Sequence, residues 1–466
     1  MSGHRMIVGA VAGAALVLAG CTGALQSPAP DAVSEVTARQ VNLPTELPPM
    51  KAFNSSRTDA PGRPNSEIGA DFLDLSFELE SGRALPVLAR FEGPVTIRMT
   101  GRKAAVLDTE LNRLIARLRG EAGIDISRVP ANAAAGITVE VIPKRQLQSL
   151  VPGAACFVAP NVSGWREYKA NRRTEQTDWT KLTQRTRMSV FIPGDVAPQE
   201  MRDCLHEEIA QALGPVNDLY RLSDSVFNDD NFHTVLTGFD MLILRAYYAP
   251  ELRSGMTRGQ VAAALPALLA RLNPAGGAGT PQARAATPRA WKQAIDTALG
   301  GNQPSTVRRA AAGRAVDIAR AMGWRDTRLA FSLFALGRLN LGINSDVALA
   351  SFREAEALYT ALPGTSLQAA HMGVQLAAHA LSLGNAETAI RIVDGHLGAV
   401  QSAQNAALLS TLLMIKAEGL EILGRDAEAQ LVRLDSLGWA RYGFGSDAEV
   451  GARLLEIAAI SPINRG

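Results

Sequence analysis

The stretch "CLHEEIAQALGPVNDLYRLSDSVFNDDN" (residues 204–231) contains the features that decide the fold of this chain. A helix is predicted over 198–213, because a proline opens it and a Gly-Pro pair ends it. Two neighbouring carboxylates, Glu207 and Glu208, lie near the end of that helix. The polar residues that follow are typical of turns, in which Asn and Asp side chains bond to the local backbone.

Strand and helix patterns precede this helix. Alternating apolar residues predict three strands, at 94–99, 135–144 and 187–194. Residues 107–123 carry apolar side chains on one helical face, with Asp108 placed as the cap. A strand, a helix, two strands and a helix in this order predict an α/β domain over 68–271, with the helix 198–213 behind a mixed sheet.

The chain begins with "MSGHRMIVGAVAGAALVLAGCTG". Its apolar run is too short to cross a bilayer and is typical of a secretion signal over residues 1–20. The end of the run, "LAGC", resembles a bacterial lipobox, which implies acylation of Cys21 after cleavage. Residues 21–67 are rich in Pro, Ser, Asn and Thr, so we expect a disordered tether there. The alternative is an ordinary signal peptide that leaves Cys21 as an unused thiol.

The lipobox resemblance implies a location as well as an anchor. Several acyl chains bury enough methylene groups for stable membrane anchoring. Thr22, which follows the cysteine, favours the outer membrane with the protein facing the periplasm, and the inner membrane is the alternative. The formal net charge is only +2. Because no strong field would attract a polyanion, we expect no nucleic-acid partner.

Two cysteines, Cys156 and Cys204, remain after Cys21. In an oxidising compartment an isolated pair predicts one disulfide. Closing a loop of this length would contribute roughly 4 kcal/mol by the chain-entropy argument. Two buried thiols are the alternative.

The C-terminal part is rich in Ala and Leu and is predicted to be helical. A linker at 272–305 is expected to hold a short helix. Residues 306–466 then show a repeated pattern, in which Gly342, Gly384 and Gly424 each end a helix. This pattern predicts an all-α helical-repeat domain that resembles tetratricopeptide repeats, although the spacing exceeds theirs. An unrelated helical bundle is the alternative.

The stretch around Glu207 resembles the metal-binding motif of metzincin-type zincins, His-Glu-x-x-His-x-x-Gly-x-x-His. In "EEIAQALGPVN", Glu207, Gln211 and Asn217 stand at the three ligand positions, and Glu208 stands at the position of the general base. Further on, "DSVF" (224–227) stands where those proteases have a methionine turn. The resemblance implies a zincin-like domain with a degenerate site.

The chain also resembles a proteobacterial family known only as domain of unknown function 2927. The resemblance rests on the stretch "DCLHEE" with "QALG", on the turn "DSVFND", and on the segment "FDMLILRAYYAPELRSGM". The family has no assigned activity, so the resemblance bears on the fold more than on the function.

Zinc hydrolases use imidazole or thiolate ligands and leave one position for water. Glu207, Gln211 and Asn217 offer one carboxylate and two amide oxygens, so we expect no metal, no cofactor and no peptidase activity. The sequence therefore predicts a catalytically inactive zincin-like domain with helical repeats that bind another envelope protein or a peptide segment. The alternative is a metal-dependent hydrolase with non-standard ligands and Glu208 as the base.

One further segment has an unusual composition. Residues 165–187, "WREYKANRRTEQTDWTKLTQRTR", mix arginine, lysine and aromatic residues. A solvated loop is the ordinary interpretation, and contact with anionic lipid or a cell-wall polymer is the alternative.

Overall fold

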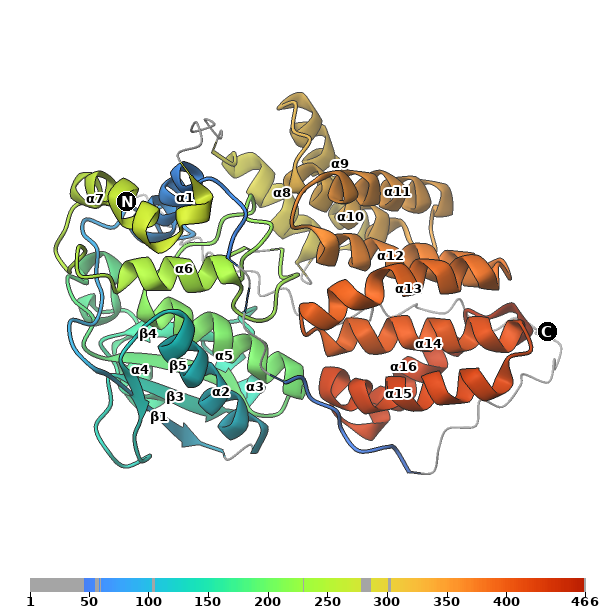
Figure 1. Cartoon of the computed structure of the whole chain (residues 1–466), viewed down its shortest axis with the longest axis horizontal. Helices are drawn as coiled ribbons and strands as arrows, with labels where there is room; N and C mark the ends of the chain where they lie inside the picture. The colour runs from blue at the N-terminus through green and yellow to red at the C-terminus, as the bar shows by residue number, and fades with distance from the viewer. Residues whose placement is uncertain are drawn as a thin grey trace, which may run out of the picture.

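The computed structural model describes residues 46–54, 58, 60–102, 105–228, 230–277, 286–300 and 303–464. An α/β domain forms the first part of the described chain, and an array of helices forms the second (Figure 1). The predicted signal at 1–20, Cys21 and most of the expected tether lie outside the described residues. None of the helices within the described ranges has the length and apolarity needed to span a bilayer.

The α/β domain is built on one mixed sheet. Its strands are β1 (Val95–Gly101), β2 (Ile126–Arg128), β3 (Ile137–Ile142), β4 (Phe157–Pro160) and β5 (Met188–Pro193). They lie in the order β2-β1-β3-β5-β4, and every neighbouring pair is parallel except β4 with β5. The three predicted strands correspond to β1, β3 and β5. All six residues of β5 are buried, as expected for a strand that is covered on both faces.

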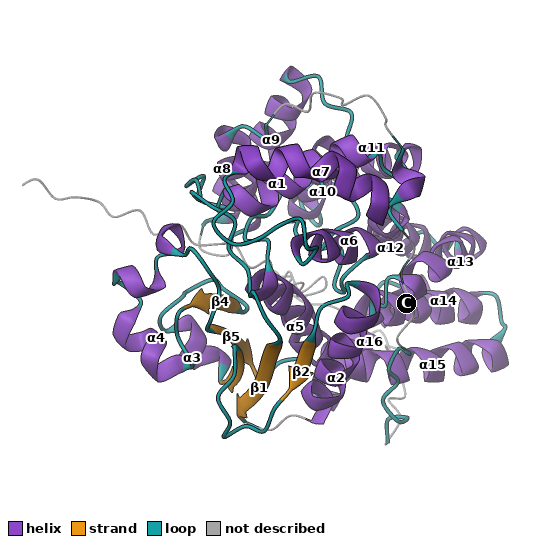
Figure 2. Cartoon of the chain, turned by 60° about the vertical axis from the view of Figure 1, so that its left-hand side comes forward, coloured by secondary structure: helices purple, strands orange, loops and turns teal. Residues whose placement is uncertain are grey.

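Helices cover both faces of this sheet. The domain contains α1 (Asn65–Phe77), α2 (Ala105–Glu121), α3 (Lys144–Gln148), α4 (Trp165–Asn171), α5 (Pro198–Leu213), α6 (Gly238–Tyr247) and α7 (Arg258–Leu272). Three short 3-10 turns accompany them: η1 (Glu175–Thr177), η2 (Trp179–Lys181) and η3 (Pro274–Gly276). α5 packs against α2, β4 and β5, and the main apolar core lies on that face. α3 and α4 cover the opposite face, where Leu147 and Trp165 join a smaller apolar cluster (Figure 2).

The observed boundaries of α5 agree with those predicted from the sequence, whereas the observed start of α2 does not. α5 begins at Pro198 and ends at Leu213, which confirms the predicted bounds. α2 begins at Ala105, so Asp108 lies inside the first turn and does not cap the helix as expected. An acidic side chain in the first turn still favours the helix, because it faces the positive end of the helix dipole.

The second part of the chain is an all-helical repeat region. Its helices are α8 (Arg289–Leu299), α9 (Ser305–Ala321), α10 (Thr327–Asn340), α11 (Ser345–Ala361), α12 (Ser366–Ser382), α13 (Ala386–Ser402), α14 (Ala406–Ile422), α15 (Asp426–Phe444) and α16 (Asp447–Ala458). A last turn, η4 (Pro462–Asn464), follows. Successive helices up to α15 pack side by side. Gly342, Gly384 and Gly424 end helices with φ of 72°, 76° and 70°, a conformation that glycine adopts without strain.

The helical array begins earlier than the sequence predicts. We expected residues 272–305 to form a linker with a short helix, but α8 packs along α9. Trp291 of α8 is fully buried, and its indole N–H donates to Ser332 Oγ at 2.9 Å. The large apolar surface of tryptophan makes α8 part of the core of the array.

The two parts share side chains at their junction. Tyr220 and Phe232, from the loop after α5, lie in the apolar core of the helical region. The Phe232 ring lies 4.6 Å from the ring of His371 on α12, between centroids. The α/β domain therefore occupies part of the surface that the helical region would otherwise offer to a partner.

The last part of the expected tether also contacts the helical region. The backbone N–H of Lys51 donates to the Gly438 carbonyl of α15 at 2.9 Å, and the Phe53 ring stacks on Trp439 at 4.5 Å. α1 then starts at Asn65. This differs from a disordered segment through residue 67, because a few apolar and backbone contacts fix a stretch whose composition alone predicts none.

Candidate functional site

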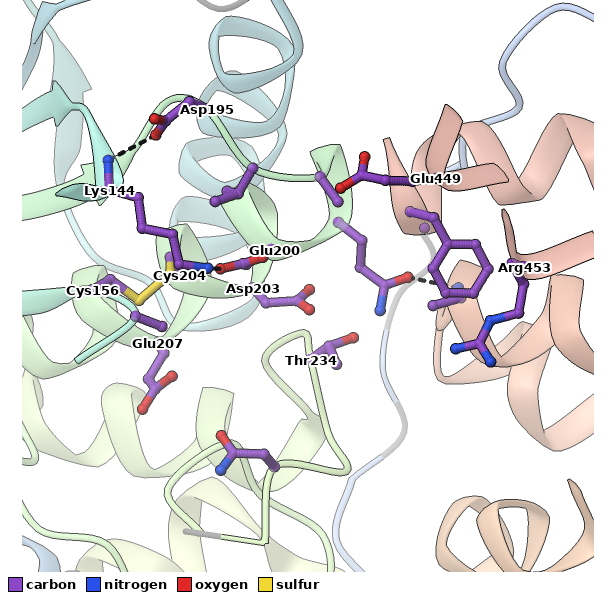
Figure 3. A pocket seen from close by; sticks show the side chains of 18 of the residues that line it. Lys144, Cys156, Asp195, Glu200, Asp203, Cys204, Glu207, Thr234, Glu449 and Arg453 are labelled. Carbon is purple, nitrogen blue, oxygen red and sulfur yellow. Dashed lines mark hydrogen bonds and ion pairs between the residues drawn. A yellow bond between two sulfur atoms is a disulfide. The ribbon is translucent and has the colours of Figure 1, made fainter. Parts of the chain in front are cut away.

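One face of α5 carries a row of polar side chains. Asp203 and Cys204 lie three and four residues after Glu200, and Glu207 lies four and three residues after them, which places all four on one side of the helix. All four line a cleft of about 420 Å³ between α5 and the helical region (Figure 3). The candidate site therefore includes Glu207 but extends from it toward the start of the helix.

The other walls of the cleft come from distant parts of the chain. The helical region contributes Ala407, Gly443, Phe444, Glu449, Arg453 and Glu456. The loop between α5 and α6 contributes Val226, Asn231, His233 and Thr234. Because the loop also inserts Phe232 into the helical core, the shape of the cleft depends on how the two parts dock.

Buried hydrogen bonds hold the two walls together. The side chain of Gln199 donates to Asn405 Oδ1 at 3.1 Å and accepts from the backbone N–H of Ala407 at 3.0 Å. Arg202, which is 2% exposed, donates to the Gln404 carbonyl at 2.9 Å. Both side chains leave α5 and end on the start of α14 or the residues just before it, so they fix the cleft at its base.

Negative charge dominates the lining of the cleft. It contains six carboxylates, at Asp195, Glu200, Asp203, Glu207, Glu449 and Glu456, and two strong cations, at Lys144 and Arg453. Both cations bind a carboxylate of the lining, Lys144 to Glu200 at 3.1 Å and Arg453 to Glu456 at 2.8 Å. Asp203 binds Arg202 at 3.0 Å, and the other carboxylates, at Asp195, Glu207 and Glu449, favour a positively charged ligand.

The ionisation of two lining residues responds to burial. Burial raises the pKa of Asp203 to about 7, although the adjacent Arg202 guanidinium favours the charged carboxylate. Burial lowers the pKa of His233, whose Nε2 lies 2.9 Å from the Ser223 carbonyl. At neutral pH, His233 is thus a neutral member of the lining.

A disulfide forms part of the cleft wall. Cys156 and Cys204 are bonded, with their Cα atoms 5.8 Å apart, which confirms the predicted pair. The bond connects the start of β4 to α5, and both cysteines line the cleft. It therefore fixes the edge of the sheet against the helix that carries the acidic face.

The three expected ligand positions do not act as a set. Glu207 faces the cleft, whereas Gln211 does not line it. Asn217 is 2% exposed and points to α1: its amide N–H donates to the Asp74 carbonyl, and its Oδ1 accepts from the backbone N–H of Asp218, both at 3.0 Å. Both polar atoms of Asn217 are thus engaged with the backbone. These residues do not fit the zinc that the resemblance to zincins would imply.

Glu208, which stands at the position of the general base in the zincin motif, is buried. Glu208 is 4% exposed, and its Oε2 has no hydrogen-bond partner among the described residues. Burial raises the pKa of Glu208 well above its ordinary value, and the charges of Glu207 and Glu80 add to the effect. Burial therefore favours the protonated carboxyl, and Glu208 does not line the cleft, so it is poorly placed to accept a proton from a substrate bound there.

The turn at 224–227 is fixed by a buried aspartate. Asp240 at the start of α6 accepts hydrogen bonds from Ser225 Oγ, from the backbone N–H of Val226 and from the backbone N–H of Thr237. Burial raises the pKa of Asp240 to about 6, against the effect of these hydrogen bonds. The hydrogen bonds between Ser225, Val226 and Asp240 thus stabilise the turn, as the polar composition of this stretch predicts.

Histidine positions give no alternative set of metal ligands. His206 Nδ1 accepts from the backbone N–H of Leu236 at 3.2 Å, and burial lowers its pKa well below the ordinary value. Within the described ranges, no group of three or more His, Cys, Asp or Glu side chains is placed to hold a metal ion.

Sequence patterns missed several residues that shape the site. Asp203 and Glu200 could have been found from their helical spacing to Glu207. Gln199, Arg202 and the walls from α14 to α16 could not, because they depend on the docking of segments about 200 residues apart.

Comparisons with known proteins bear on the α/β domain. Residues 65–267 match the model of a family described as "Protein of unknown function (DUF2927)". The match supports the resemblance in this segment and ends before the helical region. No curated protein and no solved structure matched the chain.

Proposed function

We propose that this chain is a lipid-anchored protein of the outer membrane that faces the periplasm and binds a basic peptide segment of another envelope protein. In this proposal, the zincin-like domain is catalytically inactive, and the tetratricopeptide-like helices complete its binding cleft. The observation that carries the proposal is the acidic cleft of about 420 Å³ that α5 shares with the helical region. A concave, partly apolar site with a few charged groups is the usual form of a ligand site.

The residues at the positions of a zinc ligand and a general base do not favour catalysis. Both polar atoms of the Asn217 side chain form hydrogen bonds to the backbone, and Glu208 is buried beside other acidic groups. A general base needs an unprotonated group within hydrogen-bond reach of the substrate. The helix that resembles a zinc-binding helix therefore supports binding in place of hydrolysis.

The proposed location rests on two features. "LAGC" resembles a lipobox at Cys21, outside the described residues. The bonded pair Cys156 and Cys204 supports an oxidising compartment, because disulfides persist there and are rare in the cytosol.

Peptide titration tests the cleft directly. The purified full chain would be titrated with a fluorescent Lys-rich peptide and with a Glu-rich peptide of equal length. We expect saturable binding of the Lys-rich peptide alone, and loss of that binding in Ala452→Trp, which fills the cleft from its exposed rim. Ala357→Trp, at an exposed position of α11, is the matched control and should bind as the wild type does.

Two results would contradict the proposal. The first is binding of both peptides that Ala452→Trp leaves unchanged. The second is stoichiometric zinc in the purified chain together with peptide cleavage that Glu208→Gln abolishes, since this would make the chain a hydrolase.

A further inference from the structure

A basic surface lies on α4, away from the cleft. Arg166 and Lys169 are exposed and lie on the outward face of α4, and Arg173 continues that face one turn later. The inward face carries Trp165 and Tyr168, whose rings pack against aromatic residues of β4 and β5. The helix therefore presents its cations to solvent and its apolar side chains to the sheet.

Two more arginines extend this surface. Arg187 binds Glu167 at 3.3 Å yet stays 47% exposed, and Arg172 donates to a backbone carbonyl of α4. We name these five cations the α4 surface: Arg166, Lys169, Arg172, Arg173 and Arg187. Three carboxylates lie nearby, Glu140, Glu167 and Glu175, so the surface keeps a net charge of +2.

The cations of the α4 surface are largely available to a partner. Within the described parts of the chain, no carboxylate forms an ion pair with Arg166, Lys169 or Arg173, and Arg187 is the member that has one. None of the five residues lines the acidic cleft. Positive and negative charge are therefore segregated on this molecule, which favours two separate partners of opposite charge.

We propose that the α4 surface docks on the anionic phospholipid headgroups of the membrane that anchors the chain. This inference rests on the lipid anchor at Cys21 given under the proposed function. Clusters of Lys and Arg beside a membrane gain energy from the negative surface potential of anionic lipids. The effect acts within a Debye length of the surface, about 10 Å at moderate salt, so it requires close approach.

The anchor lets the surface reach the membrane. Glu46, where the described chain begins, lies 25 positions after Cys21. A flexible chain of that length has a root-mean-square span of roughly 25–30 Å. A fully extended one reaches at most about 90 Å. The described chain begins beside α15 of the helical region, so a tether extended along the α/β domain is what lets α4 contact the leaflet that holds the acyl chains.

The form of the α4 surface favours lipid over an acidic protein. Protein interfaces depend on Trp, Tyr and Arg side chains that are buried at their centre in well-packed pockets. On α4, the aromatic residues Trp165 and Tyr168 face the sheet, and the outward face carries long, flexible cations. Dispersed cations on a convex helix match a layer of mobile headgroups, which needs no fixed complementary shape.

Docking through α4 would also orient the molecule. α4 lies on the outer side of the α/β domain, and the helical region lies on the other side (Figures 1 and 2). With α4 on the membrane, the helical region would project away from the bilayer. The acidic cleft between the two parts would then be held clear of the anionic headgroups.

Lysine labelling in reconstituted vesicles tests this docking. The processed full chain would be placed in phosphatidylcholine vesicles with or without phosphatidylglycerol, and acetylation of its lysines would be followed by mass spectrometry. We expect Lys169 to react at least about fivefold more slowly in the anionic vesicles, the effect of one cation near such a surface. High salt should restore its rate. Lys292 and Lys416, in the helical region, are internal controls and should react equally in both.

A pair of charge reversals makes the test specific. Arg166→Glu with Arg173→Glu should remove the protection of Lys169, whereas Arg353→Glu with Arg391→Glu, an equal change on exposed helices, should keep it. Protection that is equal in both lipids, or that survives the first pair, would overturn the inference.

Flotation separates this inference from the proposed anchor. Attachment to pure phosphatidylcholine vesicles reports the acyl chains at Cys21, and salt-sensitive attachment to phosphatidylglycerol vesicles reports the α4 surface. A chain that floats with neither lipid would contradict both proposals. A chain that floats only with the anionic vesicles would retain the surface and exclude the anchor.

Discussion

The turns of the helical region and the end of α5 satisfy the same backbone groups in opposite ways. In the helical region, Gly384 donates to the Leu381 carbonyl and Asn385 donates to the Ala380 carbonyl, both at 2.9 Å, so the turn closes on itself. At the end of α5, the carbonyls of Gln211 and Gly214 accept hydrogen bonds from Arg185, which lies beside β5. A helix end whose carbonyls bond to the next few residues can be predicted from the sequence. A helix end whose carbonyls bond to a distant side chain cannot.

The largest expected effect comes from removing that distant side chain. Arg185 is 3% exposed and also donates to the Ala89 carbonyl at 2.8 Å. Arg185→Met leaves three buried carbonyls without their partner, and we expect the free energy of unfolding to fall by about 5 kcal/mol. Urea unfolding would measure the change. Arg353→Met, on the exposed face of α11, should change it by less than about 0.5 kcal/mol. Equal effects would remove the contrast between the two regions.

The disulfide is the second non-local tie of the α/β domain. Cys156 and Cys204 close a loop of 48 residues, so replacing both with alanine should cost about 4 kcal/mol in the chain-entropy account. The loss should be confined to the α/β domain, because the helical region contains neither cysteine. Two alkylatable thiols in natively folded material from an oxidising compartment would show that the bond does not form.

The buried acid of α5 gives a smaller effect that depends on pH. Because the folded pKa of Glu208 lies well above its ordinary 4.5, its stabilising contribution is complete below pH 4.5 and is lost as the pH rises through the folded pKa. Glu208→Gln cannot titrate. We therefore expect the stability of the variant, relative to the wild type, to rise by roughly 1.4 kcal/mol for each pH unit between 4.5 and the folded pKa of Glu208. The exposed change Ala357→Gln, which removes no titratable group, should show no such trend in the same unfolding series. If the free energy of unfolding of the wild type instead rises relative to that of Glu208→Gln as the pH rises, the Glu208 carboxylate is charged and paired.

These contrasts explain what the sequence could and could not predict. The Leu-Gly turns and the bounds of α5 depend on neighbouring residues, so α5 and the repeated helices after residue 306 could be predicted, whereas the place of α8 in the array could not. The three main strands followed from their alternation. Phe232 in the helical core and the wall at Gly443 depend on docking, which no local pattern reports. The same reason hid the contacts of Lys51 and Phe53, since a proline-rich segment gives no sign of the helix that it contacts.

The smallest effects concern glycines within the helical region, where close packing is itself non-local. A Cβ at Gly443 of α15 would meet the backbone nitrogen of Ala407 at 2.5 Å, whereas nothing lies within 4 Å of a Cβ at Gly395 of α13. Gly443→Ala should therefore cost about 2 kcal/mol, because the two helices must separate. Gly395→Ala should stabilise the helix by about 0.5–1 kcal/mol through its higher propensity. Thermal unfolding of both variants would measure the opposite signs. Two changes of the same sign would mean that α14 and α15 do not approach this closely, and the helical region would then depend on its local turns alone.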